Sequence, residues 1–235
     1  SAALISCSKE SPAEPGSPTA TFTAQNTGTI TQTATPSATA TITPTASDTS
    51  KATATATATN TPIDRIISEA ELDGWVDSSG SSGSNTDSTI DVGDASNNNV
   101  LQGIVSFDLS GVDGPITSAK LRVYLAWVVN TPFEDIAPGV NVSHITPNVT
   151  DFNSTNLYLV HTSNTNIGLI CNSYTFGWYE LNVTSAVQDD ISNSRQRSQF
   201  RLYLSGLTDG DAAYDALQFY SSDNFEYRPE LLLEY

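Results

Sequence analysis

The sequence predicts an all-β protein: an antiparallel jelly-roll sandwich of about 8–10 strands with one short helix, preceded by a long extended N-terminal arm. Two observations lead to this fold. The composition changes at Pro62, because all three Trp and all nine Tyr residues lie in residues 63–235. In that part, apolar residues alternate with polar ones over short segments that turn-forming residues separate. We therefore assign residues 1–62 to the arm and residues 63–235 to one β-domain.

Strands are expected where apolar residues recur at every second position, since successive side chains of a strand point to opposite faces. Six segments of the domain have this pattern: Val105-Phe107-Leu109, Leu121-Val123-Leu125, Leu157-Leu159, Phe200-Leu202-Leu204, Leu217-Phe219 and Leu231-Leu233-Tyr235. A short helix is predicted at Thr184–Ile191, with Thr184 or Ser185 as its N-cap.

The arm has a sequence period of two. From Ser17 to Thr61, 18 of the 23 odd-numbered positions are Thr and three are Ser, and no Thr occupies an even position. This period indicates extended β-like backbone with hydroxyl groups on one face, whereas polyproline II would favour a period of three. The candidate O-glycosylation sites are Thr19, Thr21, Thr23, Thr27, Thr29, Thr31, Thr33, Thr35, Thr39, Thr41, Thr43, Thr45, Thr49, Thr53, Thr55, Thr57, Thr59 and Thr61.

Two interpretations of the arm remain open. It is either a glycosylated spacer that holds the domain away from a cell surface, or an extended strand that docks on a neighbouring copy of the chain. Docking of the second kind is a head-to-tail contact, which produces an open filament when the rotation between copies does not close. The in-phase prolines cannot donate to a strand ladder, so they suit an edge strand.

Cys7 and Cys171 are the only cysteines. In an oxidising compartment they are candidates for a disulfide, either within one chain or between neighbouring chains. The segment Leu4-Ile5-Ser6-Cys7 is also similar to the pattern that precedes a lipid-modified cysteine in bacterial lipoproteins. With no initiator Met or basic segment before it, Ser1 is instead expected to be a mature end left by signal-peptide removal.

The charge and hydropathy of the chain disfavour two classes of partner. The 26 Asp and Glu against 9 Lys and Arg give a net charge of −17, of which −16 belongs to residues 63–235. Such a chain has little with which to neutralise phosphates, so no nucleic-acid partner is expected. No apolar run approaches the length of a membrane span, so none is predicted.

The chain shows no recognisable catalytic constellation. His144 and His161 lie far from any nucleophile in a characteristic turn, and acidic pairs such as Asp189 and Asp190 are expected to form a solvated surface. We therefore predict no enzyme activity.

Several residues are candidates for ligand binding or modification. Asp73, Asp77, Asp91 and Asp94 lie in Gly-, Ser- and Asn-rich loops and are candidate ligands of a structural Ca²⁺, although EF-hand spacing is absent and turn formation also explains them. The Trp and Tyr residues either stack on sugars or belong to the core. Candidate N-glycosylation sites are Asn141, Asn148, Asn153 and Asn182.

A series of motifs runs through the domain: Asp73-Gly74-Trp75-Val76, Ile90-Asp91-Val92-Gly93-Asp94, Gly103-Ile104-Val105-Ser106-Phe107-Asp108-Leu109-Ser110, Ile116-Thr117-Ser118-Ala119-Lys120-Leu121-Arg122-Val123-Tyr124-Leu125, Phe200-Arg201-Leu202-Tyr203, Phe219-Tyr220-Ser221-Ser222 and Arg228-Pro229-Glu230-Leu231. This series resembles the DNRLRE-type (disaggregatase-related) domain and covers none of the arm. The resemblance implies a non-catalytic jelly-roll module of secreted bacterial and archaeal proteins, some members of which bind polysaccharide. Ser106 stands where that family often has Arg, which together with the negative charge disfavours an acidic glycan such as alginate.

From these features we predict an extracellular structural glycoprotein that polymerises into a filament, its arm docking on neighbouring subunits. The alternative is a non-catalytic carbohydrate-binding module on a glycosylated cell-surface tether. The expected partners are other copies of the chain in the first case and neutral glycans in the second. Both interpretations place the protein outside the cell or on its surface.

Overall fold

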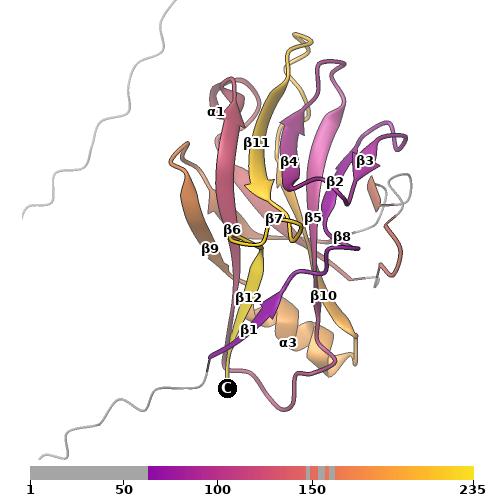
Figure 1. Ribbon diagram of the computed structural model, residues 1–235, viewed down its shortest axis with the longest axis vertical. Coiled ribbons are helices and arrows are strands. Elements are labelled where there is room, and N and C mark those ends of the chain that lie inside the picture. Colours follow the sequence, from indigo (N-terminus) through magenta and orange to yellow (C-terminus); the bar gives the residue numbers. More distant parts are fainter. Residues whose placement is uncertain (1–62, 147–148, 153–156, 159–161) are drawn as a thin grey trace, which may run out of the picture. The chain divides into compact units, whose positions relative to one another are not determined.

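The computed structural model describes residues 63–146, 149–152, 157–158 and 162–235 (Figure 1). The Thr pattern of the arm and Cys7 lie outside the described residues, as do His161 and the two sequon residues Asn148 and Asn153. The disulfide, the lipid modification, the O-glycosylation sites and the arm-mediated filament therefore remain predictions.

The described residues form an all-β fold, which confirms the predicted class. Its strands are β1 (Ile63–Ile67), β2 (Gly74–Asp77), β3 (Gly83–Ser84), β4 (Thr89–Asp94), β5 (Val100–Asp108), β6 (Ser118–Val129), β7 (Val140–Ile145), β8 (Thr162–Cys171), β9 (Gly177–Asn182), β10 (Arg197–Leu204), β11 (Asp215–Tyr220) and β12 (Glu230–Glu234). These twelve strands in the described part exceed the expected number. The additional strands include the two-residue β3, which is too short for a periodic pattern to reveal.

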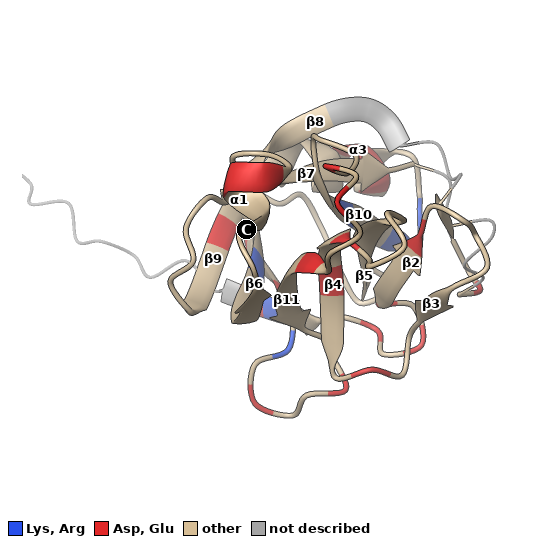
Figure 2. Cartoon of the chain, turned by 90° about the horizontal axis from the view of Figure 1, so that it is seen from above, with Lys and Arg blue, Asp and Glu red and all other residues tan. Residues whose placement is uncertain are grey.

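Every strand pair is antiparallel, and the strands follow one another in the order β1-β12-β6-β11-β4-β5-β10-β7-β8. β9 pairs with the free side of β6, while β2 pairs with β5 and carries β3. The sheet curls on itself, so that β7 and β8 lie across from β6 and β11 when the domain is viewed from above (Figure 2). The result is a two-layered jelly-roll-like sandwich.

The core lies between the two layers. The expected alternation is confirmed in β6, where Ala119, Leu121, Val123 and Leu125 are fully buried and the residues between them face outward. Phe107 of β5 and Phe200 of β10 meet at the centre, with ring centroids 6.3 Å apart.

Gly103 faces the same core. A Cβ atom at this position would lie 2.5 Å from the Ile90 side chain, so the central strand keeps a glycine there. The core thus depends on small as well as large residues at defined positions.

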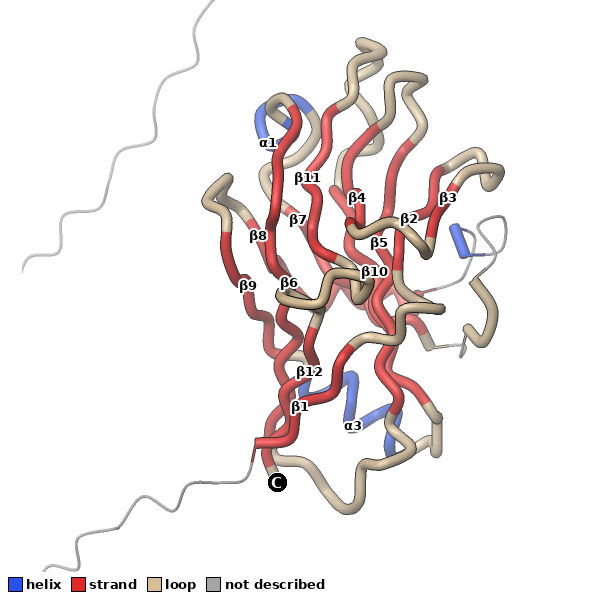
Figure 3. The backbone as a smooth tube through the Cα atoms, viewed as in Figure 1, coloured by secondary structure: helices blue, strands red, loops and turns tan. Residues whose placement is uncertain are grey.

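The predicted helix is present as α3 (Thr184–Ser192), at the end of the domain where the chain terminates (Figure 3). Its predicted cap is wrong. The N-cap residue is Val183, and the Thr184 hydroxyl instead accepts a hydrogen bond from the Ala119 backbone N–H at 2.9 Å, which fastens the helix to β6. A single helical turn, α1 (Pro132–Asp135), was not predicted.

The predicted strand at Leu157 is also not found. Leu157 is buried but has helical backbone, and residue 159 lies outside the described residues. An alternating apolar pair is therefore an ambiguous signal, because a buried helical residue satisfies it equally well.

Candidate functional site

The two outer faces of the sandwich differ. On the outer face of β5 and β10, buried polar side chains form a hydrogen-bond network. Buried Gln199 donates from Nε2 to the Val149 carbonyl at 2.9 Å and accepts from the Val149 N–H at 2.7 Å, and it also donates to the Ser106 hydroxyl at 3.0 Å. Ser106 donates in turn to Glu69, which Arg197 holds through two guanidinium nitrogens. No aromatic ring takes part in these contacts among the described residues.

Ser106 is fully buried in this network. Its identity therefore concerns the packing of this network rather than the choice of ligand. The negative charge of the domain remains the feature that disfavours an acidic ligand.

The outer face of the other layer carries aromatic side chains. They come from β6, β9, β11 and the loop before β12, and we call them the aromatic surface: Tyr124, Trp127, Trp178, Tyr220 and Tyr227. Tyr124 stands opposite Trp178 in the pairing of β6 with β9. All five residues retain solvent exposure, and Trp127 is 48% exposed.

The rings of the aromatic surface contact one another. Tyr227 lies 4.2 Å from Tyr124 and 5.5 Å from Tyr220 between ring centroids, and the planes of Tyr220 and Tyr227 differ by only 15°. Trp178 meets Tyr124 edge-on at 5.4 Å, and Trp127 meets Tyr220 edge-on at 5.4 Å. Such contacts fix ring orientation, so the surface is preorganised, although it is ridged rather than flat.

A β-bulge places Trp127 on this surface. Gln218 of β11 pairs with Trp127 and the next residue pairs with Leu125, so Ala126 is an extra residue in β6. Leu125 faces the core, and two residues later a regular strand would again point inward. The bulge shifts the alternation by one residue, which exposes Trp127 and turns Val128 toward the core.

Charged groups border the aromatic surface in compensating pairs. The Arg122 guanidinium lies 4.3 Å from the centre of the Trp178 ring, close enough for a cation–π contact. Its Nε lies 2.9 Å from a Glu180 oxygen, and its Nη1 donates to Glu230 at 3.0 Å. Lys120 also lies 3.5 Å from Glu180. The charges of Lys120 and Arg122 are thus neutralised by carboxylates, while the polar atoms of both side chains remain near the surface.

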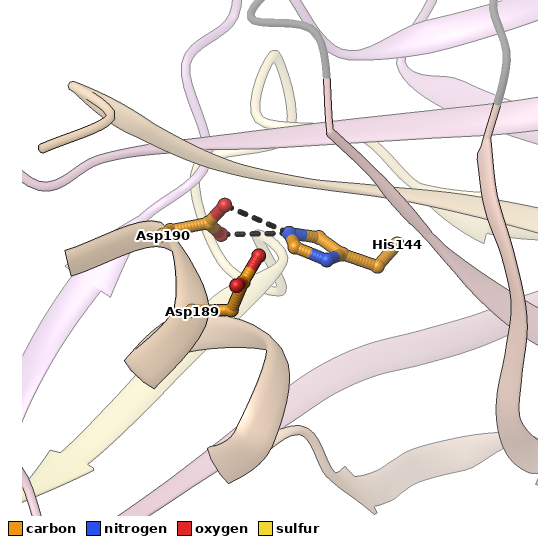
Figure 4. Close-up of side chains that lie close together, drawn as sticks. All are labelled: His144, Asp189 and Asp190. Carbon is orange, nitrogen blue, oxygen red and sulfur yellow. Dashed lines mark hydrogen bonds and ion pairs between the residues drawn. The ribbon is translucent and has the colours of Figure 1, made fainter. Parts of the chain in front are cut away.

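A cavity of about 540 Å³ lies elsewhere, beside α3. Its lining residues are His144, Asn166, Ile167, Asn182, Val183, Ser185, Ala186 and Asp189. His144 approaches Asp189 and Asp190 of α3 at this point (Figure 4). His144 Nε2 lies 2.8 Å from each carboxylate oxygen of Asp190.

Asp190 also accepts from Arg195 at 2.8 Å and from the Ser198 hydroxyl at 2.7 Å, and it is fully buried. Arg195 further pairs with Asp189 and so holds the pKa of that carboxyl below its usual range. These contacts satisfy the carboxylates and fix α3 to β7 and β10. We assign the group a structural role, and the cavity above it offers few rings for stacking.

The four predicted Ca²⁺ ligands are spread over the domain. Asp73 accepts from the N–H and hydroxyl of Ser222, and burial raises its pKa to about 6. Asp77 accepts from Ser79, Ser82 and Asn99. Asp91 accepts from Tyr214 and Gln218, and Asp94 accepts from Thr208. Among the described residues, two groups of His, Cys, Asp or Glu side chains lie close enough to share an ion, and none of the four belongs to either.

Two modification candidates lie in described strands. Asn182 is exposed at the end of β9, where its Oδ1 accepts from the Thr184 N–H at 3.0 Å. Asn141 of β7 accepts from Asn166 of β8 at 3.1 Å and is partly buried. A glycan therefore fits Asn182 better than Asn141, and glycosylation remains a prediction at both.

Cys171 is 1% exposed and belongs to the core. Its thiol donates to the Ser173 carbonyl at 3.3 Å, and burial raises its pKa. A disulfide with Cys7 of another chain requires this thiol to become accessible.

The fold and its outer face together define a β-sandwich module with one exposed aromatic face. Carbohydrate-binding module family 96 matches residues 65–235, and the chain belongs to this family. No curated protein matches the chain. Carbohydrate-binding modules are non-catalytic, which agrees with the prediction for this domain.

The family match favours the carbohydrate-binding alternative over the filament. The narrower resemblance to a DNRLRE-type domain remains a prediction. No helix of the described residues has the length and apolar character needed to cross a membrane.

Proposed function

We propose that residues 63–235 bind a neutral glycan through the aromatic surface. The observation that carries this proposal is the cluster of rings that gather, exposed and preorganised, on one outer face, whereas Ser106 and Gln199 on the other face are buried in a polar network. The apolar C–H face of a sugar ring stacks on an aromatic ring, and the hydroxyl groups at its edge need hydrogen-bond partners nearby. Trp127 and Trp178 supply the stacking faces.

Polar groups at the border of the aromatic surface supply hydrogen-bond partners for the sugar hydroxyls. Glu180 is exposed and Arg122 half-buried, and both lie beside Trp178. Their mutual ion pair leaves carboxylate lone pairs and guanidinium N–H groups for sugar hydroxyls. An acidic sugar gains less binding energy, because Lys120 and Arg122 at this border are already paired and the domain carries a net charge of −16.

Retention of the full chain on insoluble polysaccharides tests the proposal. The panel contains neutral polymers (cellulose, xylan, mannan, chitin and starch) and acidic polymers (alginate and polygalacturonate), in buffer of about 0.15 M ionic strength. We expect retention on at least one neutral polymer and on neither acidic one. Retention on the acidic polymers alone, or on none of the panel, would refute the proposal.

Polymerisation through the arm is a second proposed function, and the period of two in the Thr pattern is the observation that favours it. A variant with the Thr residues of 17–61 moved out of phase at constant composition separates the two functions. We expect this variant to lose any filaments seen in negative-stain images of native material and to retain glycan binding. Native material that shows only monomers would refute the filament. An extracellular or cell-surface location agrees with both functions.

A further inference from the structure

Three carboxylates meet at the end of the sandwich opposite α3, away from the aromatic surface. Asp209 and Asp211 lie in the loop between β10 and β11, and Asp215 begins β11. One carboxylate oxygen of each lies within 4.8 Å of the other two. Asp215 pairs in register with Asp94 at the end of β4. Figure 2 shows acidic residues on the adjoining ends of β4 and β11.

Asp94 carries a buried carboxylate oxygen without a hydrogen-bond partner. The residue has no solvent-exposed surface, and its Oδ2 accepts from the Thr208 hydroxyl at 2.6 Å. Its Oδ1 is buried and makes no hydrogen bond of normal geometry, although the Asp215 backbone N–H is near enough to favour the charged form. A buried carboxylate oxygen without a partner is costly, because desolvation is not compensated.

None of the ion pairs among the described residues involves Asp94, Asp209, Asp211 or Asp215. Carboxylates that gather without a paired cation repel one another, and a bound cation relieves that repulsion.

The loop holds its carboxylates in place by its own hydrogen bonds. The Asp211 N–H donates to Asp209 at 3.1 Å, and the Ala212 N–H donates to Asn98 of the β4–β5 loop at 2.9 Å. Gly210 has a φ of +82°, a conformation that glycine adopts without cost. The loop is thereby tied to the neighbouring hairpin.

We propose that Asp94, Asp209, Asp211 and Asp215 bind one Ca²⁺ ion. Ca²⁺ takes six to eight oxygen ligands in flexible geometry, and four carboxylates supply between four and eight. Mg²⁺ requires near-ideal octahedral geometry and keeps most of its water, so it fits a set drawn from a loop and two strand ends less well. The ion would join the β10–β11 loop to β4.

Calcium titration of the EDTA-treated full chain tests this site, by isothermal titration calorimetry and thermal unfolding. We expect one saturable site per chain and, at a hundredfold excess of Ca²⁺ over its Kd, a rise in Tm of about 5–10 °C. Mg²⁺ at equal concentration, and NaCl at equal ionic strength, should each raise Tm by less than half as much.

Two variants and one control locate the site. Asp94→Asn should abolish the calcium-dependent rise, and Asp211→Asn, at an exposed position where folding is not at risk, should weaken binding at least tenfold. Asp113→Asn removes one exposed charge elsewhere and should behave as the wild type. The proposal is overturned by absence of saturable binding below about 1 mM Ca²⁺, by an equal effect of Mg²⁺, or by unchanged binding in Asp211→Asn. A loss in Asp113→Asn equal to that in Asp211→Asn would also overturn it, since it would indicate diffuse charge screening.

Discussion

Asp73 should make the domain less stable as the pH rises toward neutrality. Its side chain has no exposed surface. Burial raises its pKa from 3.8 to about 6, although hydrogen bonds from Ser222 and Ser68 oppose the shift. The folded state therefore binds a proton more tightly than the unfolded state does.

The sign and size of the effect follow from this difference. Below pH 3.8 the carboxyl is protonated in both states and contributes no pH dependence. Between 3.8 and about 6 the folded state holds the extra proton, so the free energy of unfolding falls as the pH rises. At about 1.4 kcal/mol per pH unit, the loss is about 3 kcal/mol once the pH exceeds 6.

Denaturant unfolding of the wild type and of Asp73→Asn at several pH values from 4 to 7.5 measures this contribution. Other titrating groups cancel in the difference between the two proteins. We expect the wild type to lose about 2.4 kcal/mol relative to Asp73→Asn over this range, because part of the full loss has already occurred at pH 4. A difference that stays constant within about 0.5 kcal/mol would refute the reasoning.

Two further variants test whether the pH dependence comes from Asp73. Hydrogen bonds from Ser110 lower the pKa of Asp108, so Asp108→Asn should show a pH dependence of opposite sign: the wild type gains stability over it as the pH rises. Ser222→Ala removes a donor that favours ionised Asp73, so the upper limit of the pH window should move above 6. This second variant keeps the test valid where Asp73→Asn does not fold.

Three other predictions concern packing. In Gly93→Ala the new Cβ would lie 1.9 Å from the Asp215 carbonyl oxygen, so unfolding free energy should fall by at least about 3 kcal/mol or soluble protein should be lost; a loss below about 1 kcal/mol would contradict the clash. Phe107→Ala should cost about 3–5 kcal/mol in the same assay, because the ring is fully buried, and a much smaller cost would mean that the core collapses around the gap. In a chain whose arm cysteine is replaced by Ser, Cys171 should react with a thiol reagent only after unfolding, and rapid reaction of the native chain would show that the thiol is accessible.

The sequence predicts the all-β class and the strands with regular alternation, because their pattern follows directly from burial of one face. It fails for β8, whose first five residues, Thr-Ser-Asn-Thr-Asn, contain no apolar residue. It also fails for α1, because a helix of four residues is too short to show a helical period. Elements that tertiary contacts define leave little trace in a local pattern.

The candidate sites were less predictable than the fold. Trp127 follows Leu125 by two residues, so the alternation places it in the core, and only the bulge at Ala126 exposes it. Trp75 was an equal candidate for stacking, but it lies on β2 and donates to Asp87 at 2.9 Å. Asp94 and Asp211 are more than 100 residues apart in sequence. Their proximity follows from the pairing of β4 with β11, which no local pattern reveals.

The central claim is that the aromatic surface binds the glycan. Calorimetric titration of a soluble oligosaccharide, cut from whichever neutral polymer retains the chain, tests it most directly in Trp127→Ala, Trp178→Ala and two controls. The controls are Trp75→Ala, which removes a ring from the other layer, and Asn166→Ala, which alters the cavity beside α3. We predict that each surface variant weakens binding at least tenfold while both controls keep wild-type affinity and all four keep a cooperative thermal transition. Wild-type affinity in both surface variants, with binding lost in Asn166→Ala, would contradict the claim and place the glycan in the cavity.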